Sequence, residues 1–176
     1  MEFLKLGIFW LTLVSIGLAL AAIVVLMVVS RTKAQEGDDE LTLESLQETM
    51  WVYEKALGKE HPSTGIDYNN IALLYNEQGD YAKALEFFQK ALAIDEKTLG
   101  TEHLDTADSY NSVGEAYFDL KDYAQALEFW LKAYRIWLPQ LGEEDSNTET
   151  VKNNMECAYE ETGNAQPFED WLRGAL

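Results

Sequence analysis

The order of apolar and polar residues after residue 40 predicts helices that come in pairs. In the segment 64–78, apolar side chains recur every three or four residues, a spacing that places them on one face of an α-helix. They are Tyr68, Ile71, Ala72 and Tyr75. The segment 81–99 has a second stripe of the same spacing, made of Ala84, Leu85, Phe88, Ala91 and Leu92. We therefore predict a helix, a tight turn near Gly79 and a second helix.

The same pattern returns 42 residues later and, in a weaker form, once more. The second copy has Tyr110, Val113, Gly114 and Tyr117 on its first helix, and Ala126, Leu127, Trp130, Ala133 and Tyr134 on its second. A fixed period of this length indicates like helical hairpins, stacked so that each covers its neighbour's apolar face. We predict an all-α solenoid over 39–176, with a half-repeat at 39–58 and repeats at about 63–100, 105–142 and 147–176.

Capping residues set the predicted beginnings of the first helices. Ser63, Asp105 and Asn147 share one position in the three copies, and all three residue types are favoured N-caps.

Glycine and proline set the predicted ends. Gly79 and Gly163 can adopt the left-handed conformation that ends a helix, whereas Lys121, at the same position, adopts it with some strain. Pro139 cannot continue a helix and is expected to end the segment 123–138.

The first thirty residues are the most apolar part of the chain. Leu6 to Ser30 has no charged side chain and would extend about 37 Å as a helix, enough to cross a bilayer core. We predict a single transmembrane anchor at 1–31 and a linker at 32–38. The alternative is a cleaved signal peptide, but the apolar region of such a peptide is normally about 7–15 residues long.

Basic residues at the two ends of this segment indicate its orientation. Two basic side chains, Arg31 and Lys33, follow the segment. One basic side chain, Lys5, precedes it, together with the free amine of the N-terminus. Because basic residues are retained on the cytoplasmic side, we expect the repeat domain there, attached to the membrane.

Charge and cysteine content exclude several classes of function. The chain has 31 acidic and 13 basic residues, for a net charge of −18. Such a surface repels phosphate backbones, so we expect no nucleic-acid partner. The single cysteine, Cys157, rules out an intramolecular disulfide framework and a metal site built on paired cysteines.

The repeat positions resemble those of the tetratricopeptide repeat, or TPR. The resemblance rests on the spacing of Tyr68, Ile71, Ala72, Tyr75, Gly79, Tyr81, Ala84, Phe88 and Ala91. The 42-residue period, with His-Pro-x-Thr and Tyr-Asn-Asn-Ile-Ala, is similar to the kinesin-light-chain type of this repeat. The resemblance implies a right-handed solenoid with a concave groove lined by the first helices. It also implies protein or peptide binding and no catalysis.

The resemblance further implies which side chains line the groove. They are Asn69, Asn70, Leu73, Asn76, Asn111, Ser112, Glu115, Phe118, Asn153 and Asn154. Asn69, Asn111 and Asn153 share one position in three repeats, and an amide offers the donors and acceptors that an extended peptide backbone needs. The alternative is that these asparagines only decorate the helices. The groove positions are not basic, which argues against the carboxylate tails that some TPR proteins bind, and a basic segment with apolar anchors fits better.

We expect a membrane-anchored adaptor or scaffold rather than an enzyme. His61 and His103 stand at two separated corners without a third recurring ligand, so we expect structural roles and no metal site or cofactor. Two alternatives remain: a structural subunit of a membrane complex, and a secreted or periplasmic domain that binds or acts on peptides if the N-terminus is cleaved.

The C-terminal end predicts a second contact surface. Only about ten residues, 167–176, remain for the last helix, and a terminal repeat normally presents a polar outer face. The apolar residues of this stretch are Phe168, Trp171, Leu172, Ala175 and Leu176. Two hypotheses stay open: self-association through this edge, or a short helix that docks on the stack and ends.

Overall fold

The computed structural model describes residues 43–176, and every element in that range is an α-helix. The helices are α2 Leu43–Ala56, α3 Pro62–Glu77, α4 Tyr81–Thr98, α5 Leu104–Asp119, α6 Tyr123–Leu141, α7 Ser146–Glu161 and α8 Phe168–Ala175. The chain divides into two compact units, with α2 in the first and α3 to α8 in the second, which is residues 60–176. The predicted anchor at 1–31 and the predicted linker at 32–38 lie outside the described residues. Within residues 43–176, no helix combines the length and the apolar character that a membrane crossing needs.

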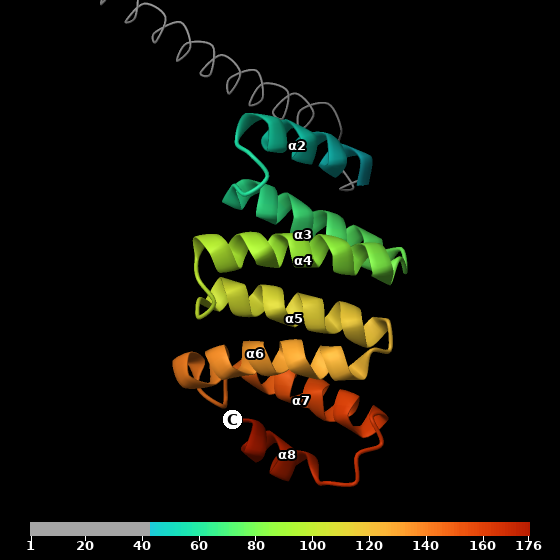
Figure 1. Cartoon of the computed structure of the whole chain (residues 1–176), viewed down its shortest axis with the longest axis vertical. Coiled ribbons are helices and arrows are strands. Elements are labelled where there is room, and N and C mark those ends of the chain that lie inside the picture. The colour runs from blue at the N-terminus through green and yellow to red at the C-terminus, as the bar shows by residue number, and fades with distance from the viewer. Residues whose placement is uncertain (1–42) are drawn as a thin grey trace, which may run out of the picture. The chain divides into compact units, whose positions relative to one another are not determined.

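Helices α3 to α8 form a stack of hairpins (Figure 1). Successive helices pack on each other along the chain from α3 to α8. This is the helical solenoid that the 42-residue period predicts, and the described residues contain no strand.

Each hairpin is held by an aromatic residue on its second helix, and of the three such residues sequence analysis named only Trp171. Phe87 of α4 lies with its ring centroid 6.0 Å from Tyr68 and 5.7 Å from Tyr75. In the next repeat Phe129 lies 6.3 Å from Tyr110 and 5.5 Å from Tyr117. Trp171 takes the same position in the third repeat, 5.1 Å from Tyr159. In the first two repeats the second helix therefore contributes two adjacent aromatic residues, one in the buried stripe and one against the tyrosines, whereas in the third repeat Leu172 takes the buried position.

The first helices begin two residues earlier than predicted. The N-caps are His61, His103 and Asp145, not Ser63, Asp105 and Asn147. The Nδ1 atoms of His61 and His103 accept the backbone N–H of the residue two positions on, at 3.2 and 3.1 Å. Pro62 then occupies the first helical turn, where a missing N–H costs nothing. The histidines thus have the structural role that was expected of them.

The ends of the helices agree with the glycine signals but not with the proline. The backbone φ angles of Gly79, Lys121 and Gly163 are 77°, 62° and 67°, which confirms the left-handed position. Pro139, however, lies inside α6, which continues to Leu141. The proline removes only its own N–H from the last turn, and the amide of Gly142 still donates to the carbonyl of Leu138 at 3.1 Å.

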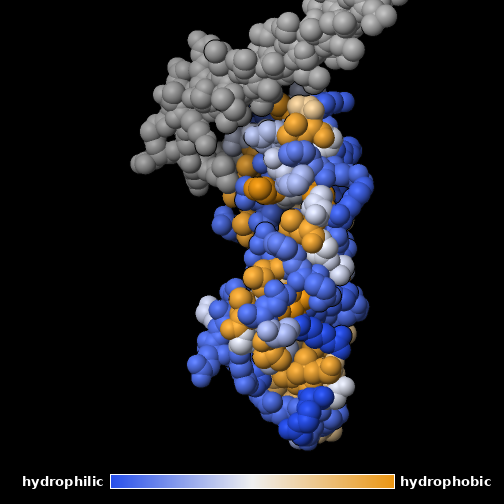
Figure 2. Space-filling view, turned by 90° about the vertical axis from the view of Figure 1, so that its left-hand side faces the viewer, coloured by the Kyte–Doolittle hydropathy of each residue, from blue (hydrophilic) through white to orange (hydrophobic). Residues whose placement is uncertain are grey.

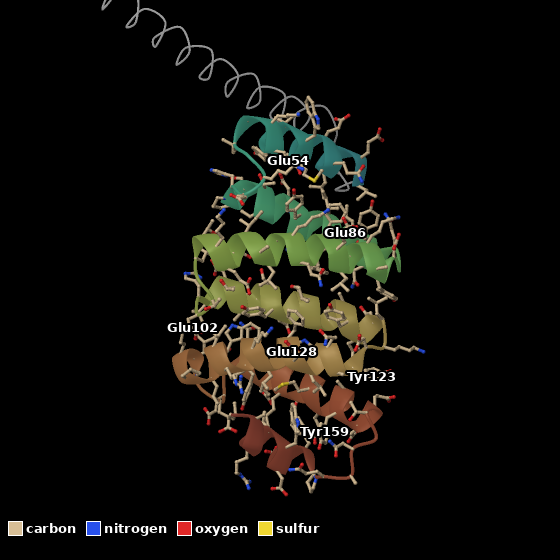
Figure 3. All side chains as sticks on the ribbon, in the orientation of Figure 1. Glu54, Glu86, Glu102, Tyr123, Glu128 and Tyr159 are labelled. Carbon is tan, nitrogen blue, oxygen red and sulfur yellow. The ribbon has the colours of Figure 1, made fainter. Side chains whose placement is uncertain are left out.

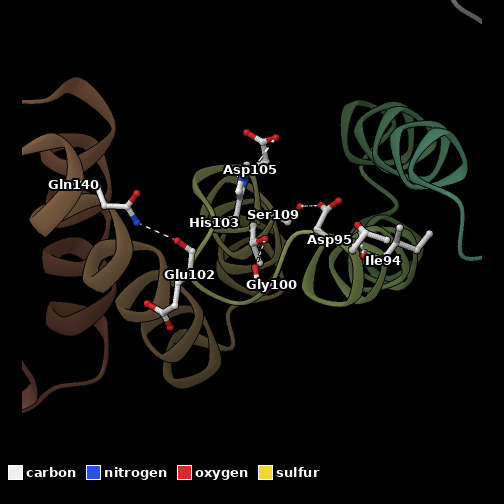
Figure 4. Close-up of polar contacts among 10 residues, drawn as sticks. Ile94, Asp95, Gly100, Glu102, His103, Asp105, Ser109 and Gln140 are labelled. Atoms are coloured by element: carbon white, nitrogen blue, oxygen red, sulfur yellow. Dashed lines mark hydrogen bonds and ion pairs between the residues drawn. The ribbon is translucent and has the colours of Figure 1, made fainter.

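Polar contacts join each repeat to the next at the corners of the stack (Figure 4). Ser109 on α5 donates its hydroxyl to Asp95 on α4 at 2.5 Å. Gln140 on α6 donates its amide to the carbonyl of Glu102 at 3.0 Å. The first bond joins α5 to α4, and the second joins α6 to the loop between α4 and α5.

Candidate functional site

A cleft of about 400 Å³ opens between the first helices of successive repeats. We call it the α3–α5–α7 cleft. It is lined by Asn76 of α3, by Glu115, Phe118 and Asp119 of α5, by Trp130 of α6, and by Asn154 and Cys157 of α7. Three repeats thus contribute to one depression. Four of the ten predicted groove residues line it: Asn76, Glu115, Phe118 and Asn154.

Aromatic rings give the cleft an apolar wall. Trp130 is only 2% exposed, and its ring centroid lies 5.6 Å from that of Phe118. The indole fits because residue 114 has no side chain: a Cβ atom there would lie 2.5 Å from Cδ1 of Trp130. The first repeat has Ala72 and the smaller Phe88 at these two positions. Among the described residues, Nε1 of Trp130 has no hydrogen-bond partner.

Two carboxylates of α5 border the cleft, and asparagines hold both. Asn111 donates its side-chain amide to Glu115 at 2.8 Å. Loss of water around the carboxylate raises the pKa of Glu115, the bond from Asn111 lowers it, and the charge of Asp119 raises it again. Partial burial likewise raises the pKa of Asp119, which a bond from Asn76 lowers. No lysine or arginine lines the cleft to balance these charges.

The remaining predicted groove residues lie on the first helices outside the cleft. Asn69, Asn70, Asn111 and Ser112 are half-buried, and Asn153 and Leu73 are exposed. Ser112 donates its hydroxyl to the carbonyl of Asp108 within α5. Within residues 43–176, Asn69 and Asn153 make no side-chain hydrogen bond, so their amides are available to a ligand.

Acidic and basic residues are sorted between the two kinds of helix. The first helices, α3, α5 and α7, carry ten acidic residues and one basic residue. The second helices α4 and α6 carry four acidic and five basic residues. The one base on a first helix, Lys152, pairs with Glu169 of α8 at 3.1 Å. The net negative charge of the described residues is therefore concentrated on the helices that form the cleft.

Most basic residues of the second helices are already paired on their own helix or at its start. Lys83 contacts Asp80, Lys90 contacts Glu86 and Lys132 contacts Glu128, all within 3.1 Å. Glu86 and Glu128 project from α4 and α6 in Figure 3. Lys90 and Lys132 also lie over the rings of Phe87 and Phe129, at 4.4 and 4.5 Å from the centroids. These lysines therefore pair with acidic residues and aromatic rings of their own hairpins and do not neutralise the acidic residues of the first helices.

The C-terminal edge buries most of its apolar residues. Phe168 and Leu172 are buried and Trp171 is half-buried against Tyr159, whereas Leu176 is 57% exposed. A second depression of about 390 Å³ lies beside them, lined by residues of α6, α7 and α8 that include Leu131, Tyr159 and Trp171. The surface shown in Figure 2 is mostly hydrophilic, with separate hydrophobic islands. Self-association through this edge stays a prediction.

Sequence analysis did not assign Trp130 and Cys157 to the site. The signal for Trp130 was present in the repeat alignment, because Gly114 and Trp130 replace Ala72 and Phe88 together. A paired change of this kind indicates that a larger side chain occupies the space of a lost methyl group. Cys157, which is exposed, gave no comparable signal.

The structure is similar to known TPR proteins. It superposes on BtubC (BKLC) from P. vanneervenii with a TM-score of 0.67 and 19% sequence identity, over 76% of this chain and 53% of that protein. It superposes on a putative kinesin light chain with nearly identical TPR-like repeats from P. anserina with a TM-score of 0.61 and 25% identity, over 76% of this chain and 63% of that one. A single-residue variant of the latter protein gives the same values. The chain thus spans 53–63% of the length of these proteins, which is less than two thirds.

Sequence comparison gives the family directly. No curated protein matches the sequence. The tetratricopeptide repeat profile, however, matches at residues 25–97, 68–129 and 105–173, which together cover most of the chain and overlap all three copies of the 42-residue pattern. The chain therefore belongs to the tetratricopeptide repeat family and is built as a scaffold suited to protein binding.

Proposed function

We propose that this chain is a membrane-anchored TPR adaptor that binds an extended segment of a partner protein along α3, α5 and α7. The segment carries basic side chains and one or two apolar anchors. The observation that carries the proposal is the sorting of charge, with ten acidic residues against one basic on these three helices. A basic segment is attracted to this face and repelled by few groups on it.

Three carboxylates of α5 have already lost part of their hydration, which favours binding of a basic partner over a purely solvent-exposed role. Loss of water raises the pKa of Asp108, Glu115 and Asp119. Neighbouring negative charges raise the pKa of Asp108 and of Glu115 further. Carboxylates in this state gain more from a bound cation than fully hydrated carboxylates do, because part of their desolvation cost has already been met in the folded protein.

The asparagines and exposed apolar residues of α3 supply the uncharged part of the site. Asn69, Asn111 and Asn153 recur at 42-residue intervals and can pair with the backbone of an extended segment. On α3, Ile66 is 63% exposed and Leu73 is 46% exposed, one on either side of Asn69. Apolar side chains of the partner would cover these two residues, which water now contacts.

The membrane anchor remains part of the proposal. Leu6 to Ser30 supports it through length and lack of charge, and the basic residues that follow favour the cytoplasmic side for the repeats. In this arrangement the anchor holds the repeats near the bilayer, and a captured partner is recruited to the membrane face. TPR scaffolds of this type are typically non-catalytic, which fits an adaptor rather than an enzyme.

Selection of displayed peptides tests the proposed binding. A library of random linear peptides is selected on the full chain in mild detergent, with binding measured at low and high salt. We expect enrichment of arginine and lysine next to apolar residues, and affinities that fall as salt rises. The Asn69→Ala, Asn111→Ala double variant should bind the selected peptides more weakly by about 1–3 kcal/mol.

The control variant changes two amide side chains outside the ten predicted groove positions. Asn147→Ala with Gln166→Ala removes two exposed amides, one in the first turn of α7 and one in the loop before α8, and should leave the affinity unchanged. Selected peptides without any charge bias, or equal binding by the Asn69, Asn111 variant, would count against the proposed surface.

A further inference from the structure

The α3–α5–α7 cleft has the properties of a receptor for one side chain. Its volume of about 400 Å³ lies in the range of small-ligand pockets. Acceptors surround it on two helices: the carboxylates of Glu115 and Asp119 on α5 and the amide of Asn76 on α3. Among the described residues, Oδ1 of Asn76 has no hydrogen-bond partner. The cleft therefore holds an excess of acceptors over donors.

Trp130 closes the cleft on the side of α6. The indole lines the cleft but is only 2% exposed, and its Nε1 atom packs against residue 114 of α5, where a Cβ atom would lie 2.6 Å away. Phe118, which is half-buried, is therefore the ring that a bound side chain can contact. The carboxylates and the amide oxygen of Asn76 are the polar groups left for a cationic side chain.

The chemistry of the lining distinguishes arginine from lysine and from a metal ion. A guanidinium group presents five N–H donors in one plane, so it can bond to two carboxylates and an amide oxygen at once and stack on an aromatic ring. Phe118 provides such a ring and is backed by the buried Trp130, with 5.6 Å between the two ring centroids. An ammonium group is a compact charge with three donors and gains less from a flat wall. Within residues 43–176, no cluster of three or more His, Cys, Asp or Glu residues could hold a metal ion.

We propose that the α3–α5–α7 cleft receives the guanidinium group of an arginine in the bound segment. Glu115 and Asp119 are its carboxylate partners, and Phe118 is the ring on which it stacks. The inference rests on the proposed function and makes it specific: the partner segment carries arginine, not merely positive charge, at the position that meets the second repeat.

The alkylation rate of Cys157 measures occupancy of the cleft, and the partner need not be identified. It lines the cleft, it is exposed, and it is the only cysteine of the chain. The test measures the rate at which iodoacetamide, a neutral reagent, alkylates Cys157 in the full chain, followed by intact mass. The probes are acetyl-arginine amide, acetyl-lysine amide and acetyl-citrulline amide, each titrated to its solubility limit. Citrulline keeps the shape of arginine and lacks its charge.

We expect saturable protection by the arginine probe. A bound probe slows the reaction by the factor 1 + [L]/Kd, roughly threefold when its concentration is twice Kd. The lysine probe should protect less, and the citrulline probe should not protect. The Glu115→Gln, Asp119→Asn double variant should lose the protection. The Glu144→Gln, Glu149→Gln variant makes the same change in net charge at exposed positions outside the cleft and should keep it.

Three results would overturn the assignment of the cleft: equal protection by citrulline, protection that survives the loss of both carboxylates, or no slowing by arginine at any concentration. The peptide selection described above separates these from a failure of the proposed function. Peptides that bind through the asparagines while Cys157 remains unprotected by arginine would refute the cleft assignment alone. Protection by arginine without any selected peptide would leave the cleft assignment standing and refute the binding of extended segments.

Discussion

Lys121 occupies a backbone position that the other repeats give to glycine. Its φ angle is 62°, and the equivalent residues Gly79 and Gly163 have φ angles of 77° and 67°. A side chain in this conformation is strained, because its Cβ atom crowds the backbone. We predict that Lys121→Gly raises the free energy of unfolding by about 0.5–1 kcal/mol, measured as a higher urea midpoint of the full chain by circular dichroism. Gly79→Lys should lower it. A stability loss in Lys121→Gly would show that the lysine side chain makes a compensating contact.

Asp67 of α3 gives a pH dependence with a defined sign. It is 7% exposed, and burial raises its pKa to about 6. One of its carboxylate oxygens, Oδ2, has no hydrogen-bond partner in the described residues. Because the pKa in the folded chain lies above the unfolded value of about 3.9, the folded state binds the proton more tightly. The stability that this proton contributes is fully present below about pH 4 and is lost as the pH rises through about 6.

The variant Asp67→Asn isolates this effect. We predict that it is about as stable as the wild type near pH 4 and more stable by about 1–3 kcal/mol near pH 7, since the amide has no charge to bury. The measurement is the free energy of unfolding of both chains across this range. A difference that does not change with pH would mean that Asp67 is already hydrated or neutralised in the folded protein.

At this scale the sequence predicts residue types better than their roles. Residue type predicted Ser63 as the N-cap, but the cap is His61, because a histidine Nδ1 can accept a backbone N–H as a hydroxyl oxygen does. Pro62 was the usable signal, since proline favours the first helical turn. The raised pKa of Asp67 could not be predicted, because it depends on burial on a face of α3 that the residue pattern alone does not assign.

At the scale of the helices, α5 and α6 are joined by a matched pair of residues. Gly114 leaves room for Trp130, whereas the first repeat pairs Ala72 with Phe88. We predict that Gly114→Ala alone lowers the free energy of unfolding by about 1–3 kcal/mol, because the new methyl group collides with the indole. Trp130→Phe alone should also destabilise, since it leaves a cavity.

The double variant, Gly114→Ala with Trp130→Phe, copies the first repeat and provides the decisive comparison. Its loss in free energy of unfolding should be smaller than the sum of the losses in the two single variants, and the difference is a coupling energy of about 0.5–3 kcal/mol. The urea midpoints of the four chains give this coupling. Additive losses would mean that the two positions do not share the same space.

Periodicity predicted the existence and order of the helices from α3 to α8, and most of their ends, within about two residues. It failed at Pro139, where the final turn of α6 is retained around a missing N–H. It also overlooked Phe87 and Phe129, because each stands next to a residue of the apolar stripe and does not belong to the three-four spacing, and it named Trp171 only as part of the C-terminal edge. Contacts between the two helices of a hairpin, not periodicity within one helix, select these rings.

For the molecule as a whole, the sequence predicted a binding face but not the cleft within it. The net charge of −18 was visible at once, whereas its concentration on α3, α5 and α7 becomes meaningful only when those helices lie on one side of the hairpins. Asn76 and Asp119 are 43 residues apart, and their contact depends on the offset between neighbouring repeats. Contacts between repeats, such as the hydrogen bond from Ser109 to Asp95, stabilise this offset, and no sequence motif predicts them.

The membrane anchor predicts the behaviour of the whole chain in extraction. If Leu6 to Ser30 crosses a bilayer, alkaline carbonate should leave the intact 176-residue protein in the membrane pellet, because a transmembrane helix is not released by removing ionic contacts. A variant that lacks residues 1–31 should appear in the supernatant. Release of the full chain, or a mature N-terminus near residue 32, would contradict the anchor and favour the cleaved form.

Site-specific photocrosslinking tests most directly the claim that the first helices bind the partner. A selected basic peptide that carries benzoyl-phenylalanine at each position in turn is irradiated with the full chain, and the crosslinked residues are identified by mass spectrometry. The account predicts crosslinks on α3, α5 and α7, centred near Asn69, Asn111 and the cleft. It also predicts that excess unlabelled peptide and high salt remove them. Crosslinks concentrated on α4 and α6 would contradict it.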